Sequence, residues 1–163
     1  QRVAIAAALV LEPRLLVADE PVSMLDVSIR AEILNLLADL KMRRSIAVLF
    51  ITHDLGTVSA VADRIAVMYL GRIVEMGTVQ EVMTAPRHPY TQALLSVVPA
   101  PNPRLRRQHI ILQGETPDPV KLPTGCRFHP RCPVAVERCR TIDPPLQTIG
   151  GTQAAACIRL DEA

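Results

Sequence analysis

The chain has 163 residues, enough for one domain or for one domain and a small appendage. Hydrophobic residues make up 49% of it and aromatic residues only 2%, so a core must be built mainly from aliphatic side chains. The net charge of +2 argues against nucleic acid as the main partner, and no apolar run approaches the roughly 18 residues of a membrane span. We therefore expect a cytosolic chain, with any membrane spans supplied by other subunits.

Strands and helices are predicted to alternate through residues 1–98. Helical spacing predicts helices, and apolar runs predict strands. The helices are expected over 1–12, 28–44, 55–62, 78–84 and 89–98, and the strands over 14–18, 46–51, 64–70 and 72–76. The last two strands are expected to form a hairpin at Gly71, and Asp26 or Ser28 is suited to cap the helix 28–44. This alternation predicts an α/β fold with a parallel sheet.

Two adjacent carboxylates, Asp19 and Glu20, follow the first apolar strand. A continuous apolar run is typical of a strand covered on both faces, and ligands bind just beyond the carboxyl ends of such strands. In phosphoryl transfer one carboxylate can hold Mg²⁺ and its neighbour can orient or deprotonate an attacking water. The alternative is a strand that ends in a solvated acidic turn.

Asp26 lies six residues after Glu20, and His53 follows the second apolar strand. The helix 1–9, the pair Asp19 and Glu20, Asp26 and His53 occur in an order that resembles the ATP-binding subunit of ATP-binding-cassette (ABC) transporters. There, a helix after the signature loop is followed by a Walker B strand, a D-loop and a switch histidine. The alternative for His53 is a histidine at a strand end that has its hydrogen bonds satisfied and no catalytic role. Asp54 is expected to be structural.

The resemblance implies a role for each of these residues. Asp19 would help to hold Mg²⁺ on ATP, Glu20 would activate the attacking water, and His53 would contact the γ-phosphate. Asp26 would lie at the interface between two ATPase domains. The implied fold is the C-terminal part of a P-loop NTPase-type parallel sheet with flanking helices. The pattern G-x-x-x-x-G-K-[ST] does not occur in the sequence, so we expect an N-terminally truncated ATPase subunit that is inactive alone.

Further segments resemble the oligopeptide and dipeptide importer group, and within it the second of two ATPase subunits. They are Glu20-Pro21-Val22-Ser23, Asp26-Val27-Ser28-Ile29 and the segment 87–95 with His88-Pro89-Tyr90. Met24 departs from the alanine that is usual in the family. The implied function is to power peptide transport from the cytoplasmic face of the membrane. The implied partners are transmembrane permease subunits, a second ATPase subunit in a homo- or heterodimer and, indirectly, an extracytoplasmic peptide-binding protein.

The composition changes near residue 99. Pro99, Pro101 and Pro103 fall within five residues, and the basic cluster 104–107 that follows is expected to be a solvated linker. We therefore expect a partial nucleotide-binding domain over 1–98, without its P-loop and signature loop, and a small Pro- and Cys-rich extension over 99–163.

All four cysteines lie in this extension, at Cys126, Cys132, Cys139 and Cys157. In a cytosolic protein such clusters more often bind metal than form disulfides. Structural zinc sites usually contain a C-x2-4-C pair, which the sequence lacks, so a 4Fe–4S cluster held by four thiolates is favoured over zinc. Free or disulfide-forming thiols remain open, with His129 as a reserve ligand. The tail also resembles the C-terminal extension of peptide-importer ATPases, some of which carry a 4Fe–4S cluster.

Two other functions compete with a transport ATPase. The chain could be a non-catalytic remnant or interaction module with a metal-stabilised tail, in which case Asp19, Glu20 and His53 would be vestigial. It could also be a soluble cassette ATPase of DNA repair or translation. The importer-like tail and the near-balanced charge argue against this last function.

Overall fold

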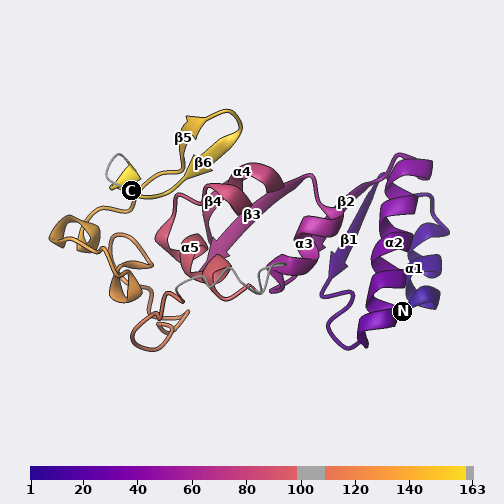
Figure 1. Cartoon of the computed structure of the whole chain (residues 1–163), viewed down its shortest axis with the longest axis horizontal. Helices are drawn as coiled ribbons and strands as arrows, with labels where there is room; N and C mark the ends of the chain where they lie inside the picture. Colours follow the sequence, from indigo (N-terminus) through magenta and orange to yellow (C-terminus); the bar gives the residue numbers. More distant parts are fainter. Residues whose placement is uncertain (99–108, 161–163) are drawn as a thin grey trace, which may run out of the picture. The chain divides into compact units, whose positions relative to one another are not determined.

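The computed structural model describes residues 1–98 and 109–160. The chain divides into two compact units, Gln1–Ala62 and Asp63–Ala163 (Figure 1). The expected linker, with Pro99, Pro101, Pro103 and the basic cluster 104–107, lies outside the described residues. Within the described ranges, no helix combines the length and the apolar character that a membrane crossing requires.

The first unit contains α1 (Arg2–Leu9), β1 (Leu15–Asp19), α2 (Val27–Arg44), β2 (Ala47–Ile51) and α3 (Leu55–Val61). β1 and β2 pair in parallel, from Leu15 opposite Ala47 to Asp19 opposite Ile51. One core joins α1, β1, α2 and the start of β2, and it is aliphatic; its buried members are Ile5, Leu16, Val22, Ile33, Leu34, Leu37 and Ile46. α1 ends before the predicted residue 12, because Glu12 has a positive φ of 48° and precedes Pro13.

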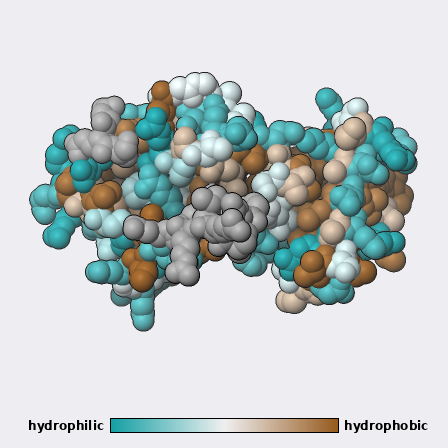
Figure 2. All heavy atoms as spheres, viewed as in Figure 1, coloured by the Kyte–Doolittle hydropathy of each residue, from teal (hydrophilic) through white to brown (hydrophobic). Residues whose placement is uncertain are grey.

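The two parallel strands are buried on one face and exposed on the other. Leu16 and Ala18 are buried, whereas Leu15 and Val17 are 54% and 56% exposed. The expectation of a strand covered on both faces is therefore wrong for the described residues. Figure 2 shows hydrophobic residues at the surface of this unit among polar ones.

The second unit is built on an antiparallel sheet in the order β3-β4-β6-β5. β3 (Arg64–Tyr69) and β4 (Arg72–Thr78) form the predicted hairpin, and β5 (Gln147–Gly150) and β6 (Gln153–Ala155) form a second one. α4 (Val79–Thr84) packs on β3 and β4, and α5 (Pro89–Ser96) follows it. Two short 3-10 helices, His129–Arg131 and Glu137–Arg140, precede β5.

Three of the four aromatic residues of the sequence meet in the core of this unit. Phe128 is 1% exposed, and its ring centroid lies 5.2 Å from that of Tyr69 and 5.3 Å from that of Tyr90. Such ring pairs stabilise a core beyond the area that they bury. Phe128 belongs to the cysteine-bearing segment, so this cluster fixes that segment against the hairpin β3–β4.

The α/β class predicted from the sequence is confirmed, but only β1 and β2 are parallel among the described strands. The compact units divide between Ala62 and Asp63, whereas a domain boundary was expected near residue 98. The difference has a physical reason, because β6 of the cysteine-bearing segment pairs with β4 of the expected first domain. Without β6, the outer side of β4 in the hairpin would offer unpaired backbone groups, and β6 pairs with them.

Candidate functional site

The carboxyl ends of β1 and β2 lie at the same edge of the parallel pair. Asp19 ends β1 opposite Ile51, and the next residue, Glu20, donates its backbone N–H to the carbonyl of Ile51 at 2.9 Å. Glu20 has a positive φ of 46°, a conformation that non-glycine residues seldom adopt. The backbone N–H and the hydroxyl of Ser23 both donate to the Glu20 carbonyl, which holds this turn in place.

Glu20 and His53 are in direct contact. The Oε1 atom of Glu20 lies 2.7 Å from Nδ1 of His53, and the His53 side chain is 80% exposed. An exposed pair of this kind contributes little to the stability of the fold, so it is notable mainly because it lies at the ends of two parallel strands. The structure thus brings together the two side chains that the sequence predicted to meet at neighbouring strand ends. We call Asp19, Glu20 and His53 the strand-end site.

Asp19 and Asp26 occupy different positions around this pair. Asp19 is exposed on the face of β1 that carries Leu15 and Val17. Asp26 is the N-cap of α2, where its Oδ1 accepts a hydrogen bond from the Ile29 N–H at 3.0 Å. The structure therefore gives Asp26 a definite structural role at the start of α2.

Asp54 caps α3 and links it to α2. Its carboxylate accepts hydrogen bonds from the Thr57 hydroxyl at 2.7 Å and from the N–H groups of Gly56 and Thr57. Arg30 of α2 pairs with the same carboxylate at 3.4 Å. The Thr57 hydroxyl, these N–H groups and the Arg30 guanidinium lower the pKa of Asp54, against the opposing effect of burial. Sequence reasoning missed Arg30, because nothing in its spacing marks it as a partner of the His53 segment.

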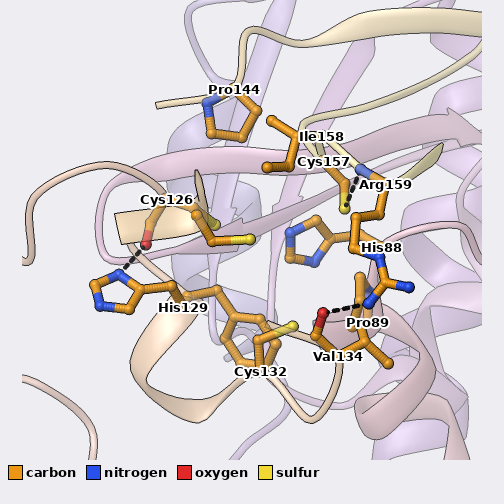
Figure 3. Close-up of a pocket in the computed structure, with 12 residues that line it drawn as sticks. His88, Pro89, Cys126, His129, Cys132, Val134, Pro144, Cys157, Ile158 and Arg159 are labelled. Carbon is orange, nitrogen blue, oxygen red and sulfur yellow. Dashed lines mark hydrogen bonds between the residues drawn. The ribbon is translucent and has the colours of Figure 1, made fainter. Parts of the chain in front are cut away.

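The four cysteines line one pocket in the second unit, which we call the cysteine pocket (Figure 3). Two local features shape it. Gly125 has a φ of 65° that favours glycine, and the Cys126 N–H donates to the Cys139 carbonyl at 2.9 Å. Cys157 comes to the same pocket from the segment after β6, across a long sequence separation.

Backbone N–H groups lie near the cysteine sulfurs. Those of Phe128 and His129 act to lower the pKa of Cys126, and that of Val134 acts to lower the pKa of Cys132. Val136 donates to Cys139 at 3.5 Å and Arg159 donates to Cys157 at 3.4 Å. Backbone donors of this kind stabilise negative charge on sulfur, as the outer shell of a metal–thiolate centre does.

The pocket disfavours the thiolate forms of Cys126 and Cys132. Burial raises the pKa of Cys126, and burial raises that of Cys132 to about 11, with a further contribution from the neighbouring cysteines in both cases. The backbone N–H donors oppose this effect. A bound cation reverses such a preference, because thiolates are the form that coordinates metal.

His88 and His129 also line the cysteine pocket. The His129 ring makes a 2.9 Å hydrogen bond through Nδ1 with the Cys126 carbonyl, and Figure 3 shows it turned away from the sulfurs. His88 is 1% exposed, and burial lowers its pKa to about 4, so the ring is neutral. Within residues 1–98 and 109–160, no three or more His, Cys, Asp or Glu side chains converge closely enough to hold a single metal ion.

Comparisons with known proteins show similarity to peptide-transport proteins. Residues 74–139 match the oligopeptide/dipeptide transporter C-terminal region. The chain is 52% identical over 157 residues to a probable peptide ABC transporter ATP-binding protein of Sinorhizobium fredii, covering 96% of this chain and 44% of that protein. It is 49% identical to the dipeptide transport ATP-binding proteins DppF of Haemophilus influenzae and Escherichia coli, covering 99% of this chain in each case and 49% and 48% of those proteins.

The chain thus spans about half the length of the curated relatives that it matches. The match extends over both units, including the strand-end site and the cysteine pocket. Over nearly its full length the chain is therefore similar to ATP-binding proteins of peptide and dipeptide transporters.

Proposed function

We propose that this chain forms part of an ATPase subunit that powers the import of peptides, at the cytoplasmic face of a membrane. The relatives named as peptide and dipeptide transport proteins support the substrate class. The observation that carries the enzymatic role is the 2.7 Å contact between Glu20 and His53 at the ends of two parallel strands. Ligands of α/β sheets bind beyond such strand ends.

The residues of the strand-end site suit Mg·ATP chemistry. Asp19 is an exposed carboxylate that would help to hold Mg²⁺, which neutralises charge on the β- and γ-phosphates when it is bound. Glu20 would orient the attacking water and accept its proton. His53 would contact the γ-phosphate, and its hydrogen bond to Glu20 keeps both side chains at one strand edge.

The partners follow from this role and remain part of the proposal. Transmembrane permease subunits would supply the path for the peptide, and a second ATPase subunit would complete a homo- or heterodimer. Asp26 would lie at that ATPase interface. An extracytoplasmic peptide-binding protein would deliver the substrate.

Substitution of Glu20 in the assembled transporter that contains this segment tests the enzymatic role. Glu20→Gln is expected to lower ATP turnover by about 100-fold or more, since a general base contributes about that much. It should leave Mg·ATP binding intact. Glu115→Gln, a matched change at an exposed carboxylate in the second unit, should leave turnover unchanged. Full turnover in Glu20→Gln would instead favour an interaction module.

We further propose that the cysteine pocket holds a 4Fe–4S cluster. The support is that four thiols line one pocket and that the backbone N–H groups of Val136 and Arg159 donate to the sulfurs of Cys139 and Cys157. Such a cluster takes one thiolate per iron, so its ligands surround a space instead of meeting at one atom. The cluster would be held by Cys126, Cys132, Cys139 and Cys157. It would stabilise a segment that is too short to bury a large core.

Anaerobic reconstitution of the chain with ferrous iron and sulfide tests this assignment. The expected product is brown, with about four iron atoms and four sulfides per chain. Cys139→Ser should lose most of the iron, because it replaces the most buried thiolate. A colourless protein that binds zinc stoichiometrically would show that zinc is the metal.

A further inference from the structure

Two hydrogen bonds, one of the side chain and one of the backbone N–H, fix the orientation of His88. Its Nδ1 accepts a hydrogen bond from the Tyr90 N–H at 3.1 Å, so His88 is the N-cap of α5. Its own backbone N–H donates to Oε2 of the buried Glu75 at 2.9 Å. Pro89 occupies the first turn of α5, where its missing N–H has no cost.

This cap determines which ring nitrogen carries the proton. A nitrogen that accepts a hydrogen bond has no proton of its own, and a neutral imidazole carries one proton. The proton of His88 is therefore on Nε2, which makes Nε2–H a hydrogen-bond donor. The ring is 1% exposed, so this donor does not point into bulk water.

The ring enters the cysteine pocket. His88 lines that pocket together with all four cysteines, and Figure 3 shows its imidazole projecting toward the sulfurs of Cys126 and Cys157. The ring centroid also lies 5.6 Å from that of Phe128, which holds the imidazole from one side. The other polar side chains of the pocket bind its backbone: His129 bonds to the Cys126 carbonyl and Arg159 donates to the Val134 carbonyl at 2.7 Å.

We propose that His88 donates its Nε2–H to a sulfur of the metal centre in the cysteine pocket, a positioning role that rests on the proposed cluster. The histidine thus caps α5 with one nitrogen and stabilises the centre with the other. The reduced form of a cluster carries one more negative charge than the oxidised form, so a donor to its sulfurs favours reduction. Hydrogen bonds to the sulfurs are among the features that set the potentials of such clusters.

Two substitutions separate the functions of the two nitrogens. Asn places an oxygen near the position of Nδ1, so His88→Asn keeps a good N-cap and removes the donor to the pocket. Gln places an amide N–H near the position of Nε2, so His88→Gln keeps the donor and weakens the cap. His109→Asn, at an exposed histidine, controls for the loss of an imidazole.

The midpoint potential of the reconstituted cluster, measured in the full chain by EPR-monitored redox titration, is the decisive readout. At a fixed potential, His88→Asn is expected to lower the ratio of reduced to oxidised cluster about tenfold, which is about 59 mV for one electron. The midpoint potentials of His88→Gln and His109→Asn should be close to that of the wild type. In thermal unfolding, His88→Gln should be less stable than His88→Asn. A wild-type potential in His88→Asn, or equal shifts in Asn and Gln, would overturn the proposal.

Failure of the cluster assignment is distinguishable from failure of the His88 role. If the wild-type chain takes up no iron and sulfide, the same variants are titrated with Zn²⁺ against a chelator. His88→Asn should then bind Zn²⁺ about 10–100-fold more weakly than wild type, as expected for the loss of an outer-shell hydrogen bond, and His88→Gln should not. Equal Zn²⁺ affinity, or no binding of either metal by the wild-type chain, would overturn the role of His88.

Discussion

Glu81 is a carboxylate whose environment favours its charged form. It accepts hydrogen bonds from the hydroxyls of Thr152 and Thr78, at 2.7 and 2.8 Å, and from the backbone N–H groups of the same residues. These hydrogen bonds lower the pKa of Glu81 to about 2, and the bond from the Thr152 hydroxyl has the largest effect. The carboxylate thus joins the start of α4 to the turn between β5 and β6.

We expect this carboxylate to make the stability of the second unit depend on pH. A group whose pKa is lower in the folded state stabilises the fold above its unfolded pKa, about 4.5, and loses that contribution as the pH falls toward 2. Wild-type stability should therefore decline over this window, and Glu81→Gln should flatten the decline. Tyrosine fluorescence during urea unfolding measures it, because both tyrosines, Tyr69 and Tyr90, lie in this unit and the sequence has no tryptophan. An unchanged pH profile in Glu81→Gln would contradict the assignment.

Gly125 and Gly114 form a matched pair for a second prediction. Both have positive φ, at 65° and 73°. A Cβ at Gly125 would lie 2.5 Å from the Cys139 carbonyl oxygen, whereas a Cβ at Gly114 would meet nothing within 4 Å. Gly114→Ala should therefore cost about 1 kcal/mol of backbone strain.

Gly125→Ala should cost about 1–3 kcal/mol more, because it adds a clash to the same strain. Urea midpoints followed by tyrosine fluorescence compare the two variants. Equal costs would mean that the close approach of residues 125 and 139 is not rigid. The clash would also displace the backbone next to Cys126, so Gly125→Ala should bind less iron than Gly114→Ala.

At the scale of elements, α2 depends on the cap at its first turn. Asp26→Ala should lower the free energy of unfolding of the first unit by about 1 kcal/mol, because it removes the acceptor for the Ile29 N–H. Asp26→Asn should be close to wild type, since Asn caps helices as well as Asp does. Far-UV circular dichroism during unfolding measures both, because α2 is an 18-residue helix.

The same pair of variants separates structure from function at Asp26. If Asp26 also acts at the proposed ATPase interface, Asp26→Asn should lower turnover of the assembled transporter while leaving α2 intact. Normal turnover in Asp26→Asn would assign this residue to capping alone. Stability that is unaffected by Asp26→Ala would show that α2 does not need the cap.

Local chemistry made several elements predictable from the sequence. The hairpin β3–β4 was predicted because Gly71 suits the turn, and it has a φ of 75° there. The contact between Glu20 and His53 was predictable because parallel strands end at the same edge of a sheet. Each of these predictions needed only neighbouring residues or one sheet rule.

Pairings between distant segments were not predictable. β5 and β6 have four and three residues, too few to show a strand pattern, and β6 is set by its pairing with β4. The exposed face of β1 was also missed, because an apolar run does not show how many of its faces are covered. The place of His88 in the cysteine pocket depends on the same long-range packing, so the sequence showed it only as a family marker.

At the scale of the whole molecule, one buried carboxylate connects several parts of the second unit. Glu75 on β4 is 0% exposed and accepts hydrogen bonds from the backbone N–H groups of Arg87 and His88, at 2.8 and 2.9 Å. The Gln153 side chain on β6 donates to it at 2.8 Å. Glu75 thus connects the hairpin β3–β4, the start of α5 and the cysteine-bearing segment.

Glu75→Gln should destabilise the second unit far more than an exposed Glu→Gln change. Every partner of Glu75 is a donor, so the new amide N–H₂ would face a donor and leave buried polar groups unpaired, at about 2–3 kcal/mol. With urea slopes of about 1–3 kcal/mol/M, the midpoint followed by tyrosine fluorescence should fall by about 0.7–3 M. Glu115→Gln should leave this midpoint unchanged.

Because the first unit has its own core, its unfolding should stay at the wild-type midpoint in Glu75→Gln. A common shift of both units would show that they unfold as one cooperative body, and no shift of either would show that Glu75 does not hold the second unit together.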